Sequence, residues 1–229
     1  MTNPVPGRGL SLQWEEKAEA IMSNTIRSGR REDARWRNGE WLFIDLGFSA
    51  TSKSTGWVRS SDEAKALTYG RAVTDLITAA GARAPTLNLV LEAPLSVAFT
   101  RDGNPTMRTI ERRKGERPRP WYSGAGAAVL LAAMHLLRKL QDAPRRRDIF
   151  LFEGFVSFKP ADQKTSHTWD VREMREVIQR PRSGRGRILE GAQLKMENTD
   201  QLESAFKVMG LDLGVPAVIE IAERTASSM

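Results

Sequence analysis

Short runs of apolar residues, separated by polar and glycine-rich segments, divide the chain into alternating predicted strands and helices. The runs at 41–47, 87–91 and 149–152 carry branched and aromatic residues, and their length predicts buried strands. Trp57-Val58 follows turn residues at 53–56 and predicts a second strand that forms a hairpin with the first. Residues 63–69 fit either a third short strand or the start of a helix, and 215–219 predict a last short strand.

Apolar residues at helical spacing predict four helices, over 12–26, 70–80, 124–140 and 169–178. Gly81 is expected to end the second of these and Ser123 to cap the third. The segment 198–206 opens with Asn-Thr-Asp and predicts a fifth helix, while 180–187 (RPRSGRGR) predicts a flexible basic linker. Strands that alternate with helices predict an α/β fold with a mixed sheet. We expect an N-terminal helical extension over 1–40 and one domain over 41–229.

The residue types that are absent or scarce limit the chemistry. The chain has no cysteine and two histidines, His135 and His167, which excludes disulfides, thiolate metal sites and a cysteine nucleophile, and argues against a multi-histidine zinc site. Oxygen ligands would have to hold any metal, which favours Mg²⁺ or Mn²⁺. No apolar run approaches the roughly 20 residues of a membrane span, and the first nine residues lack a signal core. We expect a cytoplasmic protein without a membrane partner.

Positive charge dominates one long segment of the chain. The formal net charge is +7 and the sequence pI is about 10.0, which favours a polyanionic partner, nucleic acid first. The segment 99–122 has no apolar periodicity, and its basic and aromatic residues suit a nucleic-acid backbone and its bases. The candidate contacts are Arg101, Arg108, Arg112, Arg113, Lys114, Arg117, Arg119, Trp121 and Tyr122. The composition is equally consistent with disorder until a partner binds.

Carboxylates end two of the predicted strands. Asp45 follows the apolar run 41–44, and Glu92 follows the run 87–91. Asp200 and Glu203 are spaced i, i+3, so both would project from one face of the fifth helix. If that helix packs on the sheet, four acids converge, and they would repel one another unless cations lie between them. Two magnesium ions held in this way can activate water and stabilise the leaving oxygen of a phosphodiester.

Each acid also has an ordinary structural interpretation. Asp45 can simply cap the turn that follows it, Asp200 can begin a helix, and Glu203 can lie on an exposed helix surface.

The order of these motifs resembles the ribonuclease H-like superfamily, and within it the Holliday-junction-resolvase-type nucleases and predicted nucleases of unknown function. The resemblance covers about residues 41–221 and rests on sparse motifs at 44–47 with 56–58, 90–94, 152–153 and 200–205. It implies a mixed five-stranded sheet flanked by helices, to which the N-terminal helix is added, and an endonuclease dependent on Mg²⁺ or Mn²⁺. DNA is favoured over RNA as the substrate, and the resolvase-type relatives imply a homodimer.

The resemblance also assigns roles to single residues. Asp45 would bridge both ions, Glu92 would hold one of them, and Asp200 with Glu203 the other. Glu203 departs from the resolvase-type pattern, which more often has Asp there. Because the segment before Asp200 is long, Asp170 competes for the helix position. Glu153 is a spare acid that either assists the site or only lines it.

Two other functions fit parts of the pattern. Asp45-Leu46-Gly47 followed by hydroxyl residues also resembles the first phosphate loop of actin-like ATPases and sugar kinases. Those enzymes need two such domains and a second phosphate loop, for which this chain is short, and it shows no second copy. The other alternative is a module of the same fold that binds nucleic acid or a protein without cleaving it.

Overall fold

A computed structural model describes residues 25–47, 49, 52–156, 158 and 166–221 of the chain. The predicted helix over 12–26 therefore lies almost wholly outside the described residues. Its last residue, Ile26, begins the strand β1 (Ile26–Ser28), so the predicted N-terminal extension contributes a strand to the fold. None of the helices in the described part is both long enough and apolar enough to cross a membrane.

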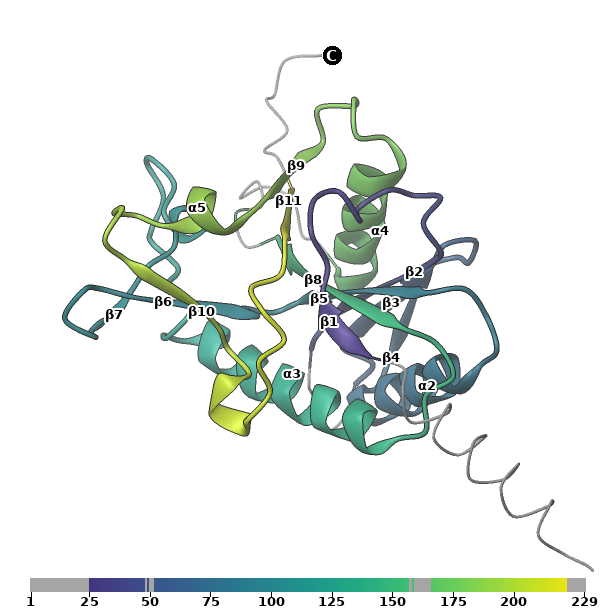
Figure 1. Ribbon diagram of the computed structural model, residues 1–229. Helices are drawn as coiled ribbons and strands as arrows, with labels where there is room; N and C mark the ends of the chain where they lie inside the picture. The colour runs from purple at the N-terminus through teal and green to yellow at the C-terminus, as the bar shows by residue number, and fades with distance from the viewer. Residues whose placement is uncertain (1–24, 48, 50–51, 157, 159–165, 222–229) are drawn as a thin grey trace, which may run out of the picture.

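A mixed sheet forms the centre of the molecule (Figure 1). Its central strand β2 (Glu40–Asp45) pairs antiparallel with β3 (Thr55–Arg59), which pairs antiparallel with β4 (Lys65–Leu67). On its other side β2 runs parallel to β5 (Leu87–Glu92), and β5 runs parallel to β8 (Ile149–Phe155). The predicted hairpin is confirmed, and residues 63–69 contain a strand before a helix.

Three further strands extend this sheet beyond β8. β1 pairs with the first half of β8, and β11 (Val218–Ile221) pairs with its second half, both in parallel. β9 (Gly186–Leu189) pairs antiparallel with β11 at the edge. The expectation of five strands is therefore wrong, since the described residues form eight strands in this sheet. The segment 180–187, predicted as a flexible linker, ends within β9.

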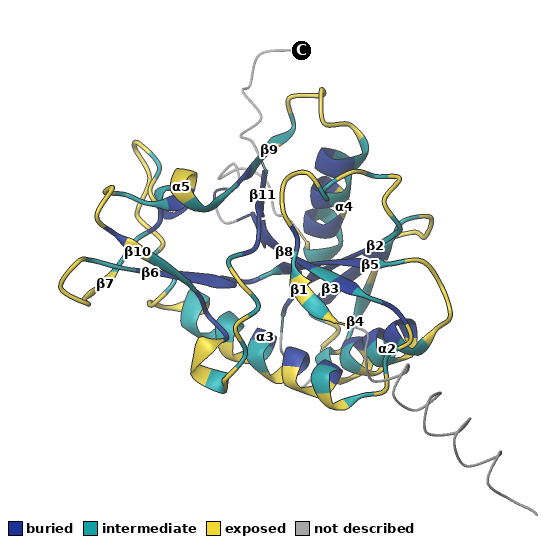
Figure 2. Ribbon diagram, viewed as in Figure 1, coloured by how far each residue is buried: buried dark blue, intermediate teal, exposed yellow. Residues whose placement is uncertain are grey.

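Helices cover both faces of the sheet. α2 (Tyr69–Gly81) and α3 (Ala125–Asp142) lie on one face, and α4 (His167–Gln179) lies on the other (Figure 1). The strand side chains divide accordingly between two apolar clusters, and Figure 2 shows the buried strands between these layers. Leu42 and Ile44 belong to the cluster with α2 and α3, whereas Trp41 and Phe43 belong to the cluster with α4. The α/β class with a mixed sheet is confirmed.

A second, three-stranded sheet projects from the first. It consists of β6 (Ser96–Phe99), β7 (Pro105–Thr106) and β10 (Gln201–Ser204), in the order β10-β6-β7. Short helices lie near it in sequence: η1 (Thr109–Glu111), α5 (Gly191–Leu194) and η2 (Lys207–Met209). The predicted helix over 198–206 is wrong, because residues 201–204 pair antiparallel with β6, from Gln201 opposite Phe99 to Ser204 opposite Ser96.

Two predicted helix caps also differ by one residue. Gly81 is the last residue of α2, and Ala82 occupies the cap position. Gly124 precedes α3 with a φ of 56°, a left-handed conformation that glycine adopts readily, and it offers no side chain to cap the helix. Ser123 instead donates its hydroxyl hydrogen to the carbonyl oxygen of Pro120.

Candidate metal centre

Asp45 and Glu92 lie side by side at the ends of neighbouring central strands. They are partners in the parallel register of β2 and β5, so their side chains project to the same face of the sheet. That face is the one covered by α4, because Phe43 and Val90, two residues earlier on each strand, pack against that helix's cluster. The sequence prediction that these two carboxylates meet is therefore supported by the register.

The first turn of α4 brings two more polar side chains to Asp45. His167 Nδ1 lies 2.9 Å from Asp45 Oδ2, within hydrogen-bonding distance. Asp170 follows three residues later, on the same side of the helix. One ligand atom from each of Asp45, His167 and Asp170 can be chosen so that all three lie within 4.8 Å of one another. One metal ion could bind all three atoms.

Glycines allow α4 to approach the hairpin this closely. A Cβ atom at Gly56, the residue opposite Asp45 in the hairpin, would lie 2.2 Å from the carbonyl oxygen of His167. A Cβ atom at Gly47 would lie 3.0 Å from His167 Cε1 and 1.9 Å from the carbonyl oxygen of Ser54. Larger residues at either position would push the histidine away from the carboxylate.

Local features also fix the start of α4. The Ser166 hydroxyl accepts a hydrogen bond from the backbone N–H of Trp169, a typical N-cap. Asp170 lies in the first turn, where the helix dipole favours a negative charge. The side chains of Asp45 and Asp170 are buried, with 3% and 2% of their surface exposed, and both lie close to His167. Such an arrangement gains strongly from a bound cation.

Glu153, the spare acid of the sequence prediction, does not belong to this centre. Its strand neighbour Phe152 packs in the α4 cluster, so Glu153 projects to the opposite face. There the Arg108 guanidinium donates to both of its carboxylate oxygens, at 2.7 and 2.8 Å, and the N–H groups of Leu95 and Ser96 donate to one of them. Burial raises the pKa of Glu153, and the hydrogen bonds and charge of Arg108 offset this in part.

Arg108 is therefore a buried residue that stabilises the fold. It is 1% exposed and also donates to Glu111, another fully buried carboxylate. The prediction that Arg108 contacts nucleic acid does not fit this burial. The three charged residues instead tie the segment after β7 to the ends of β6 and β8.

Asp200 and Glu203 lie just before and within β10 of the second sheet. Asp200 precedes β10, and its carboxylate accepts a hydrogen bond from the backbone N–H of Glu197. Glu203 is part of β10, pairs with Val97 and lies 3.6 Å from the Lys207 ammonium. The helix that was expected to carry both acids onto the main sheet does not form, so their assignment as ligands loses its structural basis. Of the acids considered for a helix position in the site, Asp170 is the one that the structure brings close to Asp45, from α4.

The remaining basic residues of the segment 99–122 are mostly at the surface. The exposed side chains are those of Arg101, Arg112, Lys114, Arg117, Arg119 and Tyr122, whereas Arg113 and Trp121 are partly buried. Arg113 donates to the carbonyl oxygen of Phe158 and stacks on its ring. Trp121 donates its indole N–H to the carbonyl oxygen of Thr106 and meets Phe99 and Tyr122 edge-on.

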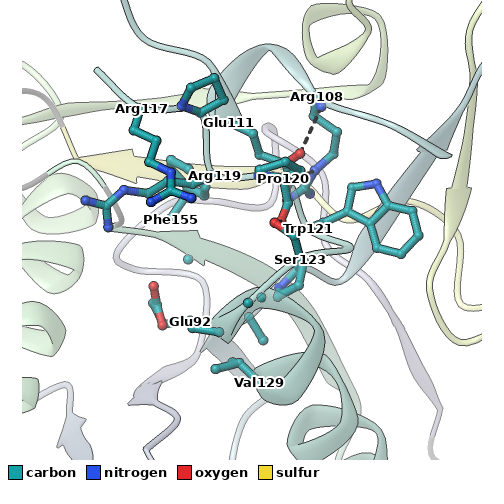
Figure 3. Close-up of a pocket in the computed structure, with 17 residues that line it drawn as sticks. Glu92, Arg108, Glu111, Arg117, Arg119, Pro120, Trp121, Ser123, Val129 and Phe155 are labelled. Atoms are coloured by element: carbon teal, nitrogen blue, oxygen red, sulfur yellow. Dashed lines mark hydrogen bonds and ion pairs between the residues drawn. The ribbon is translucent and has the colours of Figure 1, made fainter. Parts of the chain in front are cut away.

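A cavity of about 530 Å³ separates this segment from the end of β5. Glu92 forms one wall, and Arg117 and Arg119 line the cavity as well. In Figure 3 both guanidinium groups end on the side of the cavity where the Glu92 carboxylate lies, while the Trp121 ring turns to the other side. The cavity and the Asp45–His167–Asp170 group thus adjoin neighbouring strand ends.

The sequence interpretation missed His167 as a site residue. The helix was predicted to begin at residue 169, two residues after His167, whereas α4 begins at His167 and so places it i, i+3 from Asp170 on one helix face. That spacing points to no partner on its own, because Asp45 is 122 residues away.

Comparisons with models of protein families, with curated proteins and with solved structures find no match for this chain.

Proposed function

We propose that this protein is a metal-dependent nuclease with a ribonuclease H-like core, which hydrolyses phosphodiester bonds in nucleic acid. The observation that carries the proposal is the group Asp45, His167 and Asp170, with donor atoms within 4.8 Å of one another, beside Glu92 on the adjacent strand. The chain order also agrees with the resemblance: a hairpin with Asp45, a helix, a strand with Glu92, a helix, a strand, and a helix with an acid, here Asp170.

The ligand types fit Mg²⁺ or Mn²⁺. Two or three carboxylates and one imidazole form a mainly oxygen donor set, and the imidazole makes Mn²⁺ the better match. A divalent ion in such a site supplies a nucleophilic water at neutral pH and neutralises charge on the phosphate. Asp45 and Asp170 would hold the ion from opposite sides, β2 and α4, and His167 would complete the set. Glu92, the register partner of Asp45 on the adjacent strand, could help to hold a second ion or accept a hydrogen bond from the attacking water.

The location in the sheet supports a binding role as well. The chain leaves β2 toward β3 on one side, whereas after β5 it returns to this sheet at β8 on the other side, so the connections diverge between β2 and β5. Ligands of open α/β sheets bind outside the carboxyl ends of the strands at such a point. The excess of basic residues, +7 overall, suits a polyanionic substrate.

A panel of nucleic acids tests this function. Purified protein is incubated with single-stranded, duplex and branched DNA and RNA in Mg²⁺, Mn²⁺ or chelator, beside Asp45→Asn. We expect cleavage with metal by the parent chain alone. Retained binding with no cleavage under any condition would favour the non-catalytic module, and metal-dependent ATP hydrolysis would favour the kinase-like alternative.

A further inference from the structure

The cavity beside Glu92 has properties that the hydrolytic centre alone does not explain. At about 530 Å³ it falls within the roughly 300–1,000 Å³ typical of sites for small organic ligands. A bare phosphodiester backbone does not require a space of this size, because backbone phosphates are contacted at the surface by Arg and Lys side chains.

The walls of the cavity combine three kinds of surface. In Figure 3 the Glu92 carboxylate and the guanidinium groups of Arg117 and Arg119 lie on the same side of the cavity, and the Arg119 guanidinium also lies 5.4 Å from the centre of the Phe158 ring. Apolar side chains, among them Val129 and Phe155, form other parts of the wall. The arginine side chains suit an anionic part of a ligand, and the apolar surface suits a flat, weakly polar part.

The wall that carries the arginines is held rigidly. Arg108 and Glu111 also line the cavity, and Arg108 forms buried ion pairs with both Glu111 and Glu153, which fix the segment that leads to Arg117. The backbone N–H of Arg119 donates to the carbonyl oxygen of Glu111, which joins the part of the segment that carries the arginines to the same anchor. The cavity is therefore present before any ligand binds, which reduces the cost of ordering it.

We propose that this cavity accepts one unpaired nucleotide of the substrate, with Arg117 and Arg119 on its phosphate and the apolar wall against its base. This inference rests on the proposed nuclease function and narrows its substrate class. The preferred substrate contains a nucleotide free to leave the base stack, as in single strands, flaps or bulges, and not an intact duplex. Extracting a base from a perfect duplex costs a few kcal/mol, which a free or mismatched nucleotide avoids.

Binding and cleavage experiments with matched oligonucleotides test the proposal. The Asp45→Asn protein in chelator is titrated into a fluorescent duplex, the same duplex with one unpaired nucleotide, and the single strand, with anisotropy as the readout. We expect the unpaired nucleotide to tighten binding roughly tenfold, as one base packed against protein typically contributes. Equal affinity for all three oligonucleotides overturns the proposal.

A cavity-filling variant with a matched control separates the pocket from the metal centre. Ala125→Trp places a bulky ring at an exposed residue that lines the cavity, and Leu131→Trp places the same ring on an exposed position of α3 outside it. We expect Ala125→Trp to abolish the preference for the unpaired nucleotide and Leu131→Trp to retain it. Unchanged preference in both variants refutes the pocket assignment even where metal-dependent cleavage persists. Absence of cleavage by the parent chain, with the binding preference intact, refutes the nuclease function alone.

Discussion

Nδ1 of His167 lies 2.9 Å from Oδ2 of Asp45, although 122 residues separate the two in the chain. The contact joins the end of the central strand to the first turn of the only helix that covers that face among the described residues. Asp170 lies one turn further along α4 and completes the group. The site is thus assembled by the crossing of α4 over the hairpin.

Metal binding should stabilise the folded protein through Asp45 and Asp170. A ligand at 100 times its dissociation constant adds about 2.7 kcal/mol to the free energy of unfolding. We expect Mn²⁺ to raise Tm of the parent chain, and Asp170→Asn to remove most of this rise because one of two anionic donors is lost. Thermal unfolding with Mn²⁺ and with chelator measures it. Glu203→Gln is the control, since Glu203 lies beside Lys207 on the second sheet and should leave the rise unchanged.

Gly56→Ala should disturb the site through backbone packing alone. The new Cβ atom would lie 2.2 Å from the carbonyl oxygen of His167, so α4 must shift, at a cost of about 1–3 kcal/mol. The Mn²⁺-induced rise in Tm should shrink with it, because His167 and Asp170 move together. Gly70→Ala is the matched control: a Cβ atom at Gly70 meets nothing within 4 Å, and alanine in a helix should stabilise slightly. Equal behaviour of the two variants would contradict this packing argument.

The strands that formed the core could be predicted from the sequence, and the site only in part. β2, β5 and β8 are continuous apolar runs, so burial on both faces is visible in the residues themselves. Asp45 and Glu92 were found because each ends such a run. β10 could not be recognised, because its four residues become a strand only by pairing with the edge of β6, about a hundred residues earlier.

The same limit explains the errors in the site. Asp200 and Glu203 have a spacing typical of a helix, yet pairing with a distant strand overrides local preference. Glu153 follows an apolar run as Glu92 does, but an odd or even position decides which face a side chain reaches. The partner that neutralises it, Arg108, comes from a segment whose many arginines gave no indication that one of them is buried.

The buried triad of Arg108, Glu111 and Glu153 should give stability a defined dependence on pH. Burial raises the pKa of Glu153 above its ordinary value of 4.5. Between pH 4.5 and the raised pKa the folded state holds more of this proton than the unfolded state does, so the contribution of Glu153 to stability falls as pH rises through that range. Glu153→Gln has no titrating group at this position, so the parent chain should lose stability relative to the variant as pH rises. Urea unfolding of both proteins from pH 4.5 to 8 checks the direction, and a difference that grows in favour of the parent chain would oppose it.

Removal of Arg108 should be far more damaging than removal of a surface arginine of the same segment. Arg108→Met leaves two buried carboxylates, Glu111 and Glu153, without their shared cation, at a cost of about 3–5 kcal/mol. Arg112→Ala removes an exposed side chain and should change the free energy of unfolding by less than about 0.5 kcal/mol. Chemical denaturation of the two variants measures the contrast. A small effect of Arg108→Met would contradict the argument that the two buried acids depend on the guanidinium.

Salt should weaken nucleic-acid binding in proportion to the phosphates contacted by Arg117 and Arg119. For a single strand, log K falls with log[salt] by about 0.7 per neutralised phosphate. The double variant Arg117→Ala/Arg119→Ala should therefore reduce the slope by about 1.4, whereas Arg112→Ala, outside the cavity, serves as the control for lost charge. Anisotropy titrations of the Asp45→Asn background between about 50 and 200 mM salt supply the slopes. An unchanged slope in the double variant would place both guanidinium groups away from the phosphates. The cavity would then have no contact with the phosphate of the proposed nucleotide.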